Sequence, residues 1–123
     1  MINKEQFFYI YNIDEEQLKK ENIKWEDLKA IHDDFIDCKK SYETQAHLIA
    51  DILRDQPKVH SVKTRVKNVR HLIEKIIRKT PERKAKYGQD FSFTVNNYKN
   101  EITDLIGIRV IHIFKEDKKY TIL

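Results

Sequence analysis

The residues best suited to bind an anion lie in RVKNVRHLIEK, residues 65–75. Arg65 and Lys67 precede a predicted helix, and His71 and Lys75 lie about one turn apart within it. Where a strand leads into a helix start, free backbone N–H groups can join such cations in holding a polyphosphate. The alternative is a solvated basic helix whose lysines extend past its apolar edge, and spacing alone favours that alternative.

A second candidate lies in EITDLIGIRVIHIF, residues 101–114, an apolar run that contains Asp104 and Arg109. An aspartate where a buried strand begins can bind Mg²⁺, which prefers carboxylate and phosphate oxygens. Gly107 would let a ligand or another backbone approach closely. If the strand starts at Asp104, alternation places Asp104 and Arg109 on opposite faces. Asp104 could instead cap a turn while Arg109 binds carbonyl groups, and both interpretations stay open.

Several other chemistries are excluded by what the sequence lacks. Its two glycines, Gly88 and Gly107, cannot form a dinucleotide-binding fingerprint or a Walker loop, so side chains must hold any phosphate. The five histidines are scattered at no ligand-like spacing, and the single Cys38 rules out a disulfide framework. No stretch approaches the ~18 consecutive apolar residues of a membrane span. We therefore expect a cytoplasmic protein without membrane association.

The net charge of +4 conceals a strong segregation along the chain. Residues 1–57 carry 8 basic and 13 acidic side chains, whereas residues 58–86 carry 11 basic and 2 acidic ones. Residues 87–123 carry 5 of each. The middle block is therefore the candidate anion-binding surface.

The elements that must position these residues can be predicted from periodicity. Apolar residues at steps of three and four, among them Ile49 and Leu53, with Ile52 filling a gap, predict a long amphipathic helix over residues 25–53. Residues 58–66 are typical of a short strand. Asn68 is expected to cap a helix that runs through Lys79 and ends at Thr80-Pro81.

The rest of the chain predicts a polar loop and three short elements. We expect the loop over residues 81–90, a strand over 91–95, a short helix over 96–103 and the best strand over 105–114. Two or three strands beside a long helix predict an α+β fold. Because such a sheet is unfinished, we expect a truncated part of a larger domain.

Three motifs together resemble the synthetase domain of the RelA/SpoT family, the GTP pyrophosphokinases that make the alarmones ppGpp and pppGpp in the stringent response. The motifs are V-x-x-R-V-K at 62–67, Lys75, and N-E-I-T-D-L-I-G-I-R-V at 100–110. The resemblance covers residues 20–118. It implies a nucleotidyltransferase-like α+β fold with a small mixed sheet flanked by helices. Residues 1–22 would form a docking segment, and 23–123 the N-terminal part of the synthetase domain.

The resemblance also implies roles for individual residues. The family pattern R-x-K-x-x-x-S-x-x-x-K aligns with Arg65, Lys67, His71 and Lys75, which would contact the adenine and phosphates of ATP. Asp104 would bind Mg²⁺, and Arg109 would have a structural role or contact the nucleotide. In the family reaction the 3′-hydroxyl of GTP attacks the β-phosphate of ATP, and AMP leaves.

Two departures from the family pattern bear on activity. His71 stands where the family has serine, so a hydroxyl contact to phosphate is lost or replaced by an imidazole. The guanine-stacking tyrosine and the catalytic glutamate of the family have no counterpart after Phe114. We therefore expect no catalytic residue in this chain and an inactive fragment of a synthetase.

Two alternatives to GTP or GDP pyrophosphorylation stay open. A toxin of the same family would transfer pyrophosphate to tRNA, and the basic segment PERKAKYG would suit an RNA backbone. A module that binds nucleotide or RNA without catalysis would keep the basic face and lack the chemistry. The sequence is silent on oligomeric state, so a homo-oligomer stays open.

Overall fold

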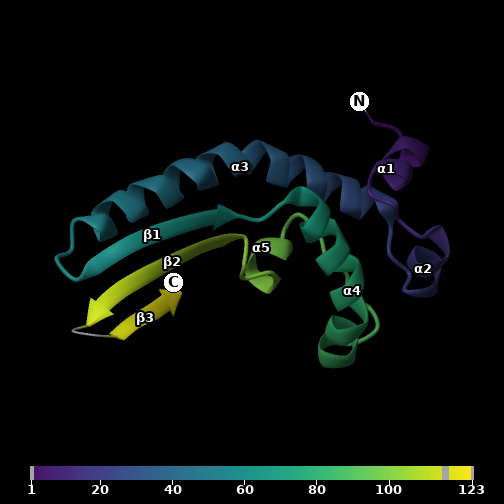
Figure 1. Ribbon diagram of the computed structural model, residues 1–123. Coiled ribbons are helices and arrows are strands. Elements are labelled where there is room, and N and C mark those ends of the chain that lie inside the picture. Colours follow the sequence, from purple (N-terminus) through teal and green to yellow (C-terminus); the bar gives the residue numbers. More distant parts are fainter. Residues whose placement is uncertain (1, 115–116, 123) are drawn as a thin grey trace. The chain divides into compact units, whose positions relative to one another are not determined.

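The computed structural model describes residues 2–114 and 117–122 (Figure 1). Contacts divide the chain into two compact units, Met1–Ile36 with Asn68–Ile102, and Asp37–Lys67 with Thr103–Leu123. Along the chain the elements are α1 (Lys4–Ile10), α2 (Glu15–Lys20), α3 (Trp25–Arg54), β1 (Val59–Val66), α4 (Val69–Tyr87), α5 (Tyr98–Glu101), β2 (Ile106–Phe114) and β3 (Asp117–Ile122).

The second unit holds an antiparallel sheet in the order β1–β2–β3 (Figure 1). Val62, Ile108 and Val110 of this sheet are buried in one cluster with Ala50 of α3. Arg54 of α3 also contacts β1, because its Nη2 donates a hydrogen bond to the carbonyl oxygen of Val62 at 3.1 Å. One face of β1 and β2 is therefore occupied by the core, and the intervening residues point to the other face.

The predicted α+β class and the two predicted strands over 58–66 and 105–114 are confirmed. Both strand pairings that the structure describes are antiparallel, so the expected mixed sheet is not what these residues form. The long helix is confirmed as α3, but Ile49 and Ile52 of its apolar stripe are exposed. Leu53 of the predicted stripe does pack against the sheet, together with Ala50.

The first unit packs α1, α2, α4 and α5 with the beginning of α3 around an apolar core. The largest fully buried side chains of this core are Phe7, Leu28, Ile31, Phe35, Leu72, Ile73, Ile76, Tyr98 and Ile102. Asn68 caps α4 as predicted, because its side chain accepts a hydrogen bond from the N–H of Arg70 at 2.8 Å.

The predicted end of α4 at Thr80-Pro81 and the polar loop after it are wrong, since the helix continues to Tyr87 with Pro81 inside it. A proline within a helix removes one backbone hydrogen bond and crowds the preceding turn. Contacts of the following turn offset this cost: Arg83 Nε donates to Glu101 Oε1 at 2.8 Å, and Lys84 Nζ donates to the carbonyl oxygen of Glu21.

The predicted strand over 91–95 is also wrong, because this segment is irregular. Its polar groups bond locally to Asn97, whose Oδ1 accepts from the N–H of Thr94 at 2.8 Å and whose Nδ2 donates to the carbonyl oxygen of Ser92 at 2.8 Å. The predicted short helix follows as α5.

Candidate anion-binding site

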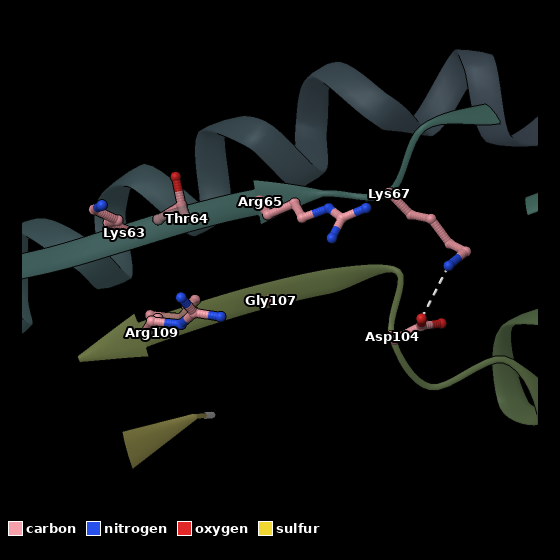
Figure 2. A pocket seen from close by; sticks show the side chains of 8 residues that line it. Lys63, Thr64, Arg65, Lys67, Asp104, Gly107 and Arg109 are labelled. Atoms are coloured by element: carbon pink, nitrogen blue, oxygen red, sulfur yellow. Dashed lines mark hydrogen bonds and ion pairs between the residues drawn. The ribbon is translucent and has the colours of Figure 1, made fainter. Parts of the chain in front are cut away.

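The register of β1 and β2 places basic side chains together on the face opposite the core. Lys63 pairs with Arg109 and Arg65 pairs with Gly107, and Lys67 follows two residues after Arg65. A cavity of about 390 Å³ lies at this face (Figure 2). Its lining consists of Lys63, Thr64, Arg65, Lys67, Asp104, Gly107, Ile108 and Arg109.

Three of these cations are unpaired among the residues that the structure describes. In the part of the chain that the structure describes, the side chains of Lys63, Arg65 and Arg109 make no hydrogen bond or ion pair. All three are exposed, and Lys63 lies directly opposite Arg109. Like charges in opposed cross-strand positions destabilise a sheet. An anion bound between them would relieve this repulsion.

The fourth cation, Lys67, is paired with the carboxylate of the pocket. Its Nζ lies 2.9 Å from Asp104 Oδ2 (Figure 2). The side chain of Lys67 is 10% exposed, whereas that of Asp104 is 51% exposed. The backbone holds the two segments in place, because the N–H of Lys67 donates to the carbonyl oxygen of Leu105 at 2.8 Å.

Gly107 leaves the cavity open between the two arginines. A Cβ atom added to Gly107 would lie 3.9 Å from the backbone carbonyl oxygen of Arg65, which is an ordinary van der Waals distance. The backbone of Gly107 does not adopt a positive φ, so the strand itself does not require glycine here. A side chain at this position would instead occupy space that a ligand can use.

The structure brings together four of the six residues predicted for the site: Arg65, Lys67, Asp104 and Arg109. The condition for placing Asp104 and Arg109 on opposite faces is not met, because β2 begins at Ile106, and both residues line the cavity. His71 and Lys75 belong to α4 in the first unit, and their predicted contacts with ATP stay a prediction.

Lys63 is a pocket residue that the motif-based reasoning missed. The signal was present in the sequence, because Lys63, Arg65 and Lys67 recur at every second position of a predicted strand. Such spacing places all three on one face.

The residues of the pocket could hold Mg²⁺ only if a bound phosphate supplied further ligands to the ion. Among residues 2–114 and 117–122, the structure contains no group of three or more His, Cys, Asp or Glu side chains that could hold a metal. Of the described residues that line the cavity, Asp104 alone supplies a carboxylate. Mg²⁺ commonly binds one or two carboxylates and takes its other ligands from substrate phosphates and water.

A second polar cluster lies in the first unit, where Tyr11 Oη is 2.7 Å from His32 Nε2 and His32 Nδ1 is 2.9 Å from Asp33 Oδ1. Burial raises the pKa of the Tyr11 hydroxyl, which opposes its use as a nucleophile. The hydrogen bond from Lys29 lowers the pKa of Asp33. His32 is buried beside the ring of Phe7, so we assign this cluster to the packing of α1 on α3.

No protein-family model, curated protein or solved structure matches the chain. Of the helices that the structure describes, none has the length and apolar character needed to cross a membrane.

Proposed function

We propose that the pocket on β1 and β2 binds the triphosphate of ATP as the donor site of an ATP:GTP 3′-pyrophosphotransferase of the RelA/SpoT type, with a nucleotidyltransferase-like fold. The observation that carries this proposal is the convergence on one cavity of the Lys67–Asp104 pair and three cations that have no partner among the described residues. The motifs that resemble the family supply four of these residues, namely Arg65, Lys67, Asp104 and Arg109.

The size and charge of the cavity support a compact polyanion. Its volume of about 390 Å³ falls within the range of about 300 to 1,000 Å³ that is common for small-molecule sites. Arginine can bind phosphate oxygens in a bidentate manner, and Arg65 and Arg109 are both exposed at this face. Single-stranded RNA is usually held by stacking on aromatic rings as well, and the described lining of the cavity contains none.

In the proposed reaction the acceptor 3′-hydroxyl releases its proton to water and its oxygen forms a bond to the β-phosphorus of ATP. The bond between that phosphorus and the oxygen bridging to the α-phosphate breaks, so AMP leaves and the acceptor gains a pyrophosphate. Reactions of this type depend mainly on alignment and on neutralising phosphate charge. Lys63, Arg65, Lys67 and Arg109 would supply the positive charge around the donor. Bound at Asp104, Mg²⁺ would neutralise further phosphate charge.

Binding and transfer can be tested separately with this chain. Calorimetric titration with ATP, ADP and AMP in the presence of Mg²⁺ should show the strongest binding for ATP, because the cations recognise phosphate charge. Arg65→Ala and Lys67→Ala should weaken binding, whereas Lys40→Ala on the exposed surface of α3 should not. Equal affinity for the three nucleotides, or equal effects of the three substitutions, would contradict a phosphate site at this pocket.

Transfer is then measured with [β-³²P]ATP and with GTP, GDP and bulk tRNA as competing acceptors. Label on a guanine nucleotide would support the alarmone reaction. Label on tRNA would replace it with tRNA pyrophosphorylation. Saturable ATP binding without label on any acceptor is the result expected of an ATP-binding fragment that lacks the catalytic glutamate.

A further inference from the structure

We infer that Lys67 makes the pocket selective for the metal–nucleotide complex over the free metal ion. In the structure its ammonium occupies the position beside Asp104 that a cation would take, 2.9 Å from Oδ2. This inference rests on the proposed function, because it assigns a role to the same pocket.

The geometry lets one ammonium serve two partners in turn. Lys67 lines the cavity and also contacts Asp104, so a rotation near the end of its side chain could carry Nζ from the carboxylate to a phosphate. Its backbone would not need to move, since its N–H is fixed to the carbonyl oxygen of Leu105. Three further cations line the same cavity and would attract the phosphates.

Charge balance in the pocket couples the affinity for the divalent ion to the affinity for the nucleotide. Without nucleotide, a divalent ion must displace the ammonium of Lys67 from Asp104 and remain among the other cations of the pocket, which repel it. With nucleotide present, the phosphates accept Lys67 and add oxygen ligands for the metal. Each ligand therefore raises the affinity of the other, as linkage requires.

The test uses Mn²⁺, which binds the same hard oxygen ligands as Mg²⁺ and can be followed by electron paramagnetic resonance. Lys67→Met should raise the affinity for Mn²⁺ without nucleotide by about fivefold. That change corresponds to about 1 kcal/mol, the upper end for exposed ion pairs. The gain in Mn²⁺ affinity caused by a non-hydrolysable ATP analogue should be smaller in this variant than in the original chain.

Lys63→Met is the matched control, because it removes one positive charge from the same cavity but leaves the ion pair between Lys67 and Asp104 in place. It should change Mn²⁺ affinity less than Lys67→Met does. Lys67→Arg keeps the charge and should resemble the original chain, and circular dichroism checks the fold of each variant.

The outcomes separate the two proposals. Unchanged Mn²⁺ affinity in a folded Lys67→Met variant, or an equal gain in Lys63→Met, would overturn the role of Lys67. Absence of saturable nucleotide binding by the original chain would instead overturn the proposed function.

Discussion

The ion pair between Lys67 and Asp104 joins a buried ammonium to a half-exposed carboxylate. Removing the carboxylate leaves a positive charge with little access to water, whereas removing the ammonium leaves a carboxylate that water can reach. Loss of one partner of a buried pair is costly because the other charge stays behind. The two halves of this pair should therefore contribute unequally to stability.

We expect Asp104→Asn to lower the free energy of unfolding by about 1 to 2 kcal/mol, a value reduced from that of a fully buried pair because Asp104 is half exposed. Lys67→Met should lower it by less than about 1 kcal/mol, since its apolar side chain can follow the path of the lysine stem. Urea denaturation of both variants measures the difference. Equal losses would show that burial of Lys67 does not govern the pair.

Replacing one of the two opposed cations, Lys63 of β1 and Arg109 of β2, should stabilise the fold and weaken ATP binding. Lys63→Thr removes the repulsion with Arg109 and introduces a residue that favours strands. We expect the free energy of unfolding to rise by about 0.5 kcal/mol and ATP binding to weaken. Denaturation and calorimetry report the two effects. Lys63→Arg keeps the charge and is the control. A fall in stability with unchanged ATP binding would contradict this prediction.

Gly107 offers a way to block the cavity without disturbing the sheet. Gly107→Val places a branched side chain over the cavity floor, and its Cβ meets no backbone closer than 3.9 Å. Valine also favours strands over glycine by up to about 1 kcal/mol. We expect a chain at least as stable as the original that has lost ATP binding, whereas Gly107→Ala should keep part of the affinity. Normal ATP binding by a folded Gly107→Val variant would place the ligand elsewhere.

Asp33 predicts a specific dependence of stability on pH. Its pKa lies below the ordinary value of 3.8, chiefly because Lys29 donates a hydrogen bond to it. Since the folded-state pKa is lower than the unfolded one, this contribution is present above pH 3.8 and is lost as the pH falls through the folded value. Between pH 5 and pH 2.5, Asp33→Asn should lose less unfolding free energy than the original chain does. Identical pH profiles would show that the contact adds nothing in solution.

Local patterns were sufficient for much of the fold. The apolar periodicity of α3, the cap at Asn68 and the alternation of β1 are properties of short segments, and each was predictable. The basic face was predictable from the same alternation, because strand residues two apart share a face, although Lys63 was not assigned to the site.

The errors arose where distant contacts override local signals. Pro81 remains helical because Arg83 and Lys84 are held by residues far from them in the sequence. The pairing of Lys67 with Asp104 spans 37 residues, and only the register of β1 with β2 brings them together. Periodicity within one segment carries no information about such a contact.

The central claim is that ATP binds on the open face of β1 and β2. Two-dimensional ¹H–¹⁵N NMR of the labelled chain, titrated with Mg²⁺ and ATP, tests it most directly. We predict saturable shifts of the amide signals of residues 63–67 and 104–109, with the signals of the exposed α3 residues Lys40 and Leu48 unchanged. Saturable shifts that leave residues 63–67 and 104–109 unaffected, or no saturable shifts at all, would contradict the account.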